Sequence, residues 1–300
     1  MAMLRLKPLS PGFGLEACGV DLAQPLDGGG FREIEETFFR AQVLVFRGQS
    51  LTPMQFVSFA SRFGPPEPHV IDQFHHPVDR NILVLSNRVE DGKPLGLADA
   101  GTYFHTDYSY LAVPARATTL YSIEVPAKGG NTLFANQYAA YDALPEAMKQ
   151  RIEPMVGIHH YGNRKERNDA SRTAASPLTD EQKAKMPLIT HPLVRRHPVM
   201  GRKALYSVSG SSYGIVGMPE DEAVALLDEL AAHATQPRFQ LSLTYGVGDL
   251  VIWDNASLLH AATLLDPCYA RTLWRITLKE PAPEGRAAAV LAPTFAQGMM

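Results

Sequence analysis

Short runs of apolar residues, each ended by a glycine or a proline, recur along the chain and limit its possible folds more than any other feature. Glycine and proline mark turns, so runs of about four to eight apolar residues between them predict strands. The chain holds 23 glycines and 23 prolines, which is enough to delimit many such runs. We predict strands over seven segments: Val43 to Phe46, Ile82 to Leu85, Ala117 to Ile123, Thr132 to Ala135, Ala204 to Val208, Leu250 to Trp253 and Arg271 to Lys279.

Only a few stretches have the periodicity of a helix. Thr52 to Gln55 has the pattern of a capping box with proline at the first helical position, and Gly64 ends the apolar spacing that follows. Similar spacing predicts a helix around residues 31–41 and another around 223–230. Because few predicted strands alternate with helices, we expect a mainly β fold with flanking helices, a jelly roll (double-stranded β-helix).

We interpret residues 1–280 as a single domain, because no segment within them has the composition of a linker. Residues 162–187 are polar and rich in Arg and Lys, which indicates either a solvated surface loop or a mobile lid. The Ala/Pro-rich tail, 281–300, is expected to be poorly ordered.

Composition excludes several classes of function. The net charge is −3, with no long Lys/Arg block, so we expect no nucleic-acid partner. No apolar stretch is long enough to span a membrane, and residues 1–8 lack the core of a signal peptide. Two cysteines cannot form a disulfide framework, so a cytoplasmic location is favoured.

Two widely separated segments carry candidate metal ligands. His105 and Asp107 are two residues apart, so in an extended segment their side chains point to the same face. A third candidate, His260, follows an apolar strand and polar turn residues. Each group by itself also suits an exposed polar residue or a buried structural histidine. Together, two histidines and one carboxylate are the ligand set of non-haem Fe(II) oxygenases.

The last predicted strand carries two arginines on one face. Arg271 and Arg275 lie on the same face, about 13 Å apart at ~3.3 Å per residue, and the opposite face is the more apolar one. If the arginine face lines a barrel interior, each guanidinium needs an anion, because an unpaired buried charge is very costly. The alternative is an edge strand whose arginines point into water.

Several ordered motifs together resemble the TauD/TfdA family of Fe(II)- and 2-oxoglutarate-dependent dioxygenases, from about Leu6 to Glu280. Asn131 stands where the family's Gly-Gly-Asp-Thr motif has aspartate. The motifs that carry the resemblance are Gly19-Val20-Asp21-Leu22, Arg62-Phe63-Gly64, Phe104-His105-Thr106-Asp107, Gly129-Gly130-Asn131-Thr132, His197-Pro198 with Gly201-Arg202-Lys203, and Trp253-Asp254-Asn255 with His260.

The resemblance implies a role for each matching residue. His105, Asp107 and His260 would bind Fe(II), and Arg271 with Thr132 would hold the distal carboxylate of 2-oxoglutarate. O₂ would be the second cosubstrate, and succinate and CO₂ would be released as a small anionic substrate is hydroxylated. The residues implied at the substrate are His69, Gly101, Tyr108, Tyr110 and Arg275.

The expected substrate class depends on two positions at which this sequence differs from the family's pattern. By resemblance, Ala100 and Gly101 stand at positions where an amine-binding member of the family contacts the substrate's ammonium group, and neither side chain can accept a hydrogen bond from it. We therefore expect an alkyl sulfonate, a sulfate ester or a carboxylate such as an aryloxy acid, and by resemblance a homo-oligomer. Two other functions remain open at this point: a zinc hydrolase with the same three ligands, and a jelly roll that binds anions without turnover.

Overall fold

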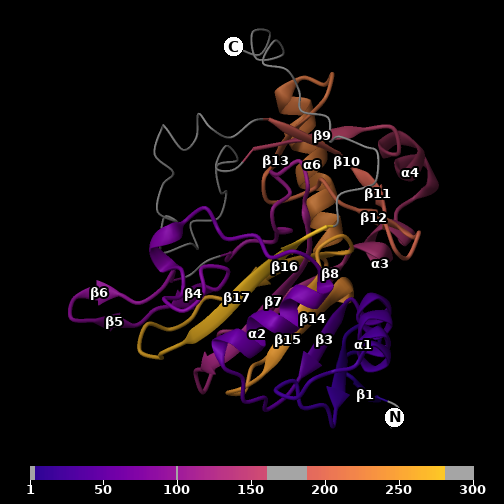
Figure 1. Cartoon of the computed structure of the whole chain (residues 1–300). Helices are drawn as coiled ribbons and strands as arrows, with labels where there is room; N and C mark the ends of the chain where they lie inside the picture. The colour runs from indigo at the N-terminus through magenta and orange to yellow at the C-terminus, as the bar shows by residue number, and fades with distance from the viewer. Residues whose placement is uncertain (1–3, 99–100, 161–187, 281–300) are drawn as a thin grey trace.

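The computed structural model describes residues 4–98, 101–160 and 188–280. The predicted lid at 162–187 and the predicted tail at 281–300 lie outside these described residues. Strands predominate and the helices lie around them, which confirms the mainly β, jelly-roll prediction (Figure 1).

The largest sheet has seven strands in the order β1-β2-β3-β15-β7-β17-β4, with antiparallel pairing everywhere except between β2 and β3. Most of its neighbouring strands are far apart in sequence, so the sheet brings together the two ends of the described chain. The bounds are Arg5–Pro8 (β1), Leu15–Cys18 (β2), Val43–Phe46 (β3), Leu83–Ser86 (β4), Ala115–Glu124 (β7), Leu250–Asp254 (β15) and Thr272–Lys279 (β17).

A second sheet of three strands, in the order β14-β8-β16, faces the inner side of the large sheet. Its strands are Thr132–Asn136 (β8), Gln240–Leu243 (β14) and Leu258–Ala262 (β16). Side chains of both sheets meet in one buried cluster, called the inner core here: Val43, Val45, Leu83, Leu85, Leu120, Phe134, Leu241, Leu243, Val251, Trp253, Leu258 and Leu273.

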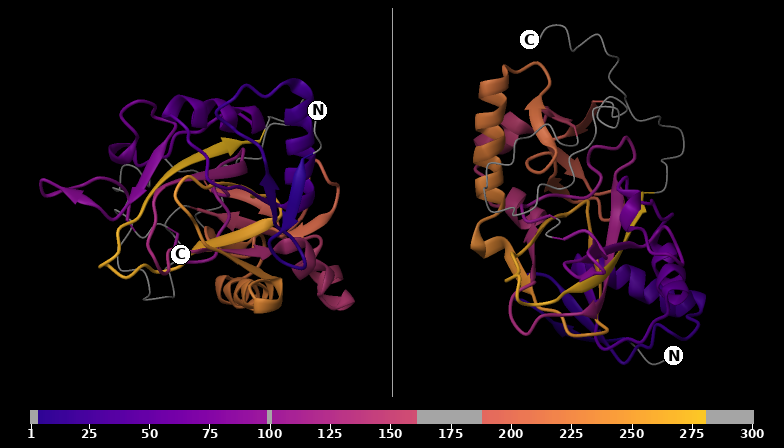
Figure 2. Two further views of the ribbon diagram at one scale, coloured as in Figure 1. Left: turned by 90° about the horizontal axis from the view of Figure 1, so that it is seen from below. Right: turned by 90° about the vertical axis from the view of Figure 1, so that its left-hand side faces the viewer.

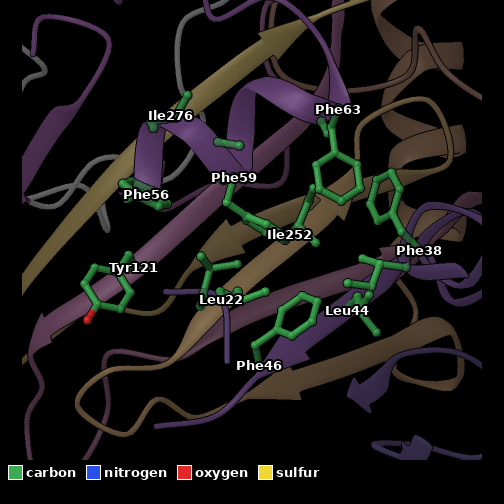
Figure 3. Packing of buried hydrophobic residues seen from close by; sticks show 14 of the residues in the cluster. Leu22, Phe38, Leu44, Phe46, Phe56, Phe59, Phe63, Tyr121, Ile252 and Ile276 are labelled. Carbon is green, nitrogen blue, oxygen red and sulfur yellow. The ribbon is translucent and has the colours of Figure 1, made fainter. Parts of the chain in front are cut away.

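The outer side of the large sheet is covered by two helices, α1 (Gly28–Ala41) and α2 (Pro53–Ala60). Thr52 caps α2 through the predicted reciprocal bonds with Gln55. Phenylalanines of both helices pack on alternate residues of the strands below, such as Leu44 and Ile252 (Figure 3). A continuous apolar run such as 43–46 is therefore explained by a strand buried on both faces.

The remaining elements form a second layer around α6 (Glu220–Ala234), on the opposite side of the molecule from α1 and α2 (Figure 2, left). They comprise the helices α3 (Gln137–Asp142) and α4 (Glu146–Ile152), and the strands β9 (Val156–His159), β10 (Ile189–Pro192), β11 (Val194–Arg196), β12 (Lys203–Leu205) and β13 (Ser212–Ile215). The short elements elsewhere are β5 (Val89–Glu90), β6 (Lys93–Pro94) and the 3₁₀ turns Ser61–Phe63, Asp72–Phe74 and Pro237–Phe239.

The predicted alternation along the last strand is confirmed. Leu273 packs in the inner core, whereas Ile276 and Leu278 pack under the helices, so the arginine face of β17 points inward. The strand predicted over 204–208 is shorter than expected and spans 203–205, because residues 206–209 turn toward the site. Within the described ranges, no helix combines the length and the apolar character needed to cross a bilayer.

Candidate metal centre and its pockets

Two backbone hydrogen bonds link the two histidines of the site. The N–H of His105 donates to the carbonyl of His260 at 2.9 Å, and the N–H of His260 donates back at 2.8 Å. This pair is an isolated antiparallel bridge between His105 and the middle residue of β16. Directly opposed residues of an antiparallel pair present their side chains on the same face, and the two imidazole rings lie 4.2 Å apart.

Asp107 completes a compact group of ligand atoms. One ligand atom from each of His105, Asp107 and His260 lies within 4.8 Å of the others. The Nε2 of His105 is 3.6 Å from Asp107 Oδ1, and the Nε2 of His260 is 3.6 Å from Asp107 Oδ2. The Nδ1 of His105 is bonded to the Tyr103 carbonyl at 2.8 Å, which leaves its Nε2 facing the group. The predicted ligands are therefore brought together, although far apart in sequence.

The protonation states of Asp107 and His260 favour binding of a cation. Burial by itself would raise the pKa of Asp107, but the charge of Arg275 and the electrostatic interactions with His260 and His105 hold it well below its usual range. Burial and the neighbouring His105 lower the pKa of His260 well below its usual value. At neutral pH the group therefore offers an ionised carboxylate and an uncharged His260 imidazole.

This donor set fits an iron ion. Two imidazole nitrogens and one carboxylate oxygen on one side of a metal leave the remaining positions open for other ligands, as in non-haem Fe(II) oxygenases. Among the described residues, no other group of His, Cys, Asp or Glu has this arrangement. Chemistry at such a centre requires a second molecule held beside it, and two groups of side chains described below could bind one.

Two glycines enclose His105 so closely that neither has room for a side chain. A Cβ at Gly101 would lie 2.6 Å from Cε1 of the His105 ring, and one at Gly210 would lie 2.8 Å from the His105 Cβ. Both residues have left-handed backbones, with φ of +71° and +69°. The contact places Gly101 beside the metal centre, while its predicted substrate role stays a prediction.

The cost of crowding His105 can be separated from the cost of backbone strain. Gly201 has φ +67°, but a Cβ there would meet no atom within 4 Å, so Gly201→Ala suffers the strain alone, about 1–2 kcal/mol. We expect Gly101→Ala and Gly210→Ala to lower the free energy of unfolding by a further 1–3 kcal/mol or so, because the methyl group overpacks against His105. Urea unfolding of the metal-free proteins measures the difference, and equal losses in all three variants would contradict it.

The first group consists of Arg271, Thr132 and Tyr245. Arg271 is buried immediately before β17, and its backbone N–H donates to the side-chain oxygen of Asn87 at 2.9 Å. The Thr132 hydroxyl lies 2.7 Å from the Tyr245 hydroxyl. Burial raises the pKa of Tyr245 to about 12, against the lowering effects of Thr132 and Arg271, so this hydroxyl keeps its proton at neutral pH. A cation and two hydroxyls from three elements suit a carboxylate group.

The second group consists of Arg275, His69 and Tyr108. Arg275 donates to Asp107 Oδ1 at 2.6 Å and is largely buried. The Tyr108 ring lies 6.1 Å from the His69 ring and 5.8 Å from the Tyr110 ring. Tyr108 has φ +53°, a left-handed backbone that is uncommon outside glycine, immediately after the metal-centre carboxylate. The predicted substrate residues other than Gly101 therefore gather on one side of Asp107.

Sequence reasoning missed three polar residues of the site, Tyr245, Thr118 and Asn255. Asn255 lies within one of the family-like motifs, but Tyr245 and Thr118 belong to no motif or spacing that could have identified them. Each becomes visible only through hydrogen bonds to residues on other strands.

The whole chain was compared with proteins of known family. Residues 5–277 match the model of the family described as "Taurine catabolism dioxygenase TauD, TfdA family". The chain is 34% identical over 285 residues to the alpha-ketoglutarate-dependent 2,4-dichlorophenoxyacetate dioxygenase of Cupriavidus pinatubonensis, covering 92% of this chain and 97% of that one. It is 33% identical to the (S)-phenoxypropionate/alpha-ketoglutarate-dioxygenase of Sphingobium herbicidovorans, with coverages of 93% and 96%.

Solved structures give the same result. The crystal structure of AAD-2 in complex with Mn(II) and N-oxalylglycine superposes with a TM-score of 0.77 at 32% identity. The match covers 93% of this chain and 98% of AAD-2.

Proposed function

Because the chain belongs to the TauD, TfdA family and is thus a 2-oxoglutarate-dependent dioxygenase using Fe(II), we propose that it hydroxylates a small organic anion, with an aryloxy carboxylate as the favoured class. An alkyl sulfonate or a sulfate ester is the second candidate class. The observation that carries the proposal is a buried arginine beside aromatic rings at the metal centre: Arg275, with Tyr108 and Tyr110 next to it.

In this proposal, His105, Asp107 and His260 hold the iron. Bound there, Fe(II) supplies the activation of O₂ that is coupled to decarboxylation of 2-oxoglutarate. Arg271 binds the distal carboxylate of 2-oxoglutarate, and Thr132 donates its hydroxyl to the same group. The protein's contribution is to orient both molecules and to exclude water.

The substrate's anionic end is assigned to Arg275 and His69. His69 accepts the backbone N–H of Ile71 on its Nδ1 at 3.1 Å, so its Nε2 carries the hydrogen. Burial and the charge of Arg275 lower the pKa of His69 to about 3, so the ring is neutral at pH 7. Arg275 therefore supplies the positive charge and His69 a neutral donor, a combination suited to a carboxylate or sulfonate.

The rest of the substrate is assigned to the aromatic side. The Tyr108 hydroxyl donates to the Glu67 carbonyl at 3.2 Å. Its ring contacts the rings of His69 and Tyr110. Aromatic side chains favour offset or edge-to-face contact with another ring. The relatives named above act on aryloxy acids, which supports an aromatic ring here. Gly101 offers no side chain to an amine, which counts against an amino sulfonate.

The test is oxygen uptake and succinate release with Fe(II) and 2-oxoglutarate across a matched panel. The panel holds aryloxyacetates, their uncharged amides, straight-chain sulfonates, sulfate esters and an amino sulfonate. We expect aryloxyacetates to give the highest kcat/KM, and their amides to lose about 100-fold because an amide offers Arg275 no negative charge. Higher kcat/KM for sulfonates would move the assignment to the second class. Equal rates with acids and amides would contradict an anionic substrate altogether.

The proposal extends to the setting of the enzyme. The two cysteines, Cys18 and Cys268, are both free thiols, which supports a cytoplasmic location. By resemblance to the family we also propose a homo-oligomer.

A further inference from the structure

The metal-centre carboxylate is held from behind by a threonine. The hydroxyl of Thr118 donates to Asp107 Oδ2 at 2.6 Å, a short bond of the kind made to an ionised oxygen. Thr118 lies on β7, opposite Trp253 in the register with β15, and is fully buried. No sequence motif includes it, and none of the roles assigned above uses it.

The threonine is in turn oriented by Asn255. The Asn255 side-chain amide donates to Thr118 Oγ1 at 2.9 Å. On its other side, Asn255 Oδ1 accepts from the indole N–H of Trp253 at 3.2 Å and from the backbone N–H of Asp107 at 3.3 Å. All four residues are buried, so water does not compete for these bonds.

The indole of Trp253 determines which group donates and which accepts in each of these hydrogen bonds. An indole nitrogen can only donate, so the atom of Asn255 that faces Trp253 must be its oxygen. The amide nitrogen then faces Thr118, whose hydroxyl must accept there. Because a hydroxyl has a single hydrogen, that of Thr118 is left to be donated to Asp107.

We infer that Thr118 and Asn255 are positioning residues that hold the Asp107 carboxylate in its metal-binding orientation, through the hydrogen-bond chain Trp253 to Asn255 to Thr118 to Asp107. The inference rests on the proposed role of Asp107 as a metal ligand. Partners behind a ligating group fix its orientation, and their loss costs metal affinity even though they never touch the ion.

The chain offers a matched control on the same strand. Thr119 is the next residue of β7 and is also fully buried, but it points to the opposite face of the sheet. Its hydroxyl bonds to the Ile276 carbonyl at 3.3 Å instead of to a ligand. Thr118→Val and Thr119→Val therefore make the same chemical change at the same depth, and only the first breaks the chain to Asp107.

The experiment measures the dissociation constant for Mn(II) alone, from the electron paramagnetic resonance signal of the free ion. We expect Thr118→Val to weaken Mn(II) binding by about 10- to 100-fold and Thr119→Val by less than twofold. Thr118→Ser, which keeps the hydroxyl, is expected to bind within about threefold of the wild type. Melting temperatures of the metal-free proteins verify folding, and Thr118→Ala replaces Thr118→Val if the latter is unfolded.

The outcomes separate this inference from the proposed function. Equal Mn(II) affinity in Thr118→Val and the wild type would overturn the positioning role while leaving the metal site intact. Equal losses in the Thr118 and Thr119 variants, or failure of Thr118→Ser to restore binding, would reduce Thr118 to a packing residue. Absence of Mn(II) binding by the wild type would instead overturn the proposed metal centre itself.

Discussion

Replacing His260 by alanine is expected to weaken binding of Fe(II) or Mn(II) by at least about 100-fold and to reduce succinate formation to background. Loss of a partner behind a ligand already costs about 10- to 100-fold in metal affinity, and removal of the ligand itself costs more. His260 is buried, and among the described residues no fourth histidine, cysteine, aspartate or glutamate belongs to the metal-binding group. Mn(II) titration and succinate quantification under air measure the two effects.

The control for this variant is a histidine outside the metal centre. His233, on α6, bonds to the Ala140 carbonyl at 2.8 Å, and His233→Ala should leave Mn(II) affinity unchanged. Metal-free His260→Ala should still unfold cooperatively, because a smaller side chain leaves the backbone bridge to His105 in place. Mn(II) binding by His260→Ala within tenfold of the wild type would remove His260 from the ligand set.

The second large effect compares Arg271 with Arg275, because each arginine is expected to bind a different ligand. Arg271→Ala is expected to raise the Kd for 2-oxoglutarate by about 100-fold, while Arg275→Ala raises the Kd for the anionic substrate by a similar factor. Each change leaves an anionic group of the ligand without its charged partner. The four dissociation constants, measured by calorimetry on Mn(II)-loaded protein without oxygen, test the assignment.

The division of roles predicts that each variant leaves the other ligand's Kd within a few fold. Arg275→Ala also removes the bond to Asp107 Oδ1, so metal loading must be verified before each titration. If Arg275→Ala weakened 2-oxoglutarate as strongly as the substrate, the two arginines would have to be regarded as one shared anion site.

Much of the arrangement could be predicted from local patterns. The alternation along the last predicted strand placed Arg271 and Arg275 on one face, because side chains of a strand have a period of two. That this face points inward is known only from the packing of the assembled sheets. The capping box at Thr52 and the continuous apolar run at 43–46 specified a helix and a buried strand with no tertiary information. The His105 and Asp107 pair was predicted on the same grounds, as two residues of one extended segment.

The interior hydrogen bonds could not be predicted this way. Thr118 meets Asp107 because β7 lies beside β15 in a register that sets Thr118 opposite Trp253, and no local pattern encodes that register. Tyr245 meets Thr132 across two segments in the same manner. Polar residues of this kind have no periodicity of their own, so their partners emerge only when the sheets are assembled.

The backbone bridge between His105 and His260 makes metal binding depend on folding. In an unfolded chain His260 is not held beside His105 and Asp107, so the ion binds the native state far more tightly than the unfolded state. A free ion concentration 100 times the Kd then stabilises the folded protein by about 2.7 kcal/mol. A complete set of three ligands therefore forms only once β16 is present and paired with His105.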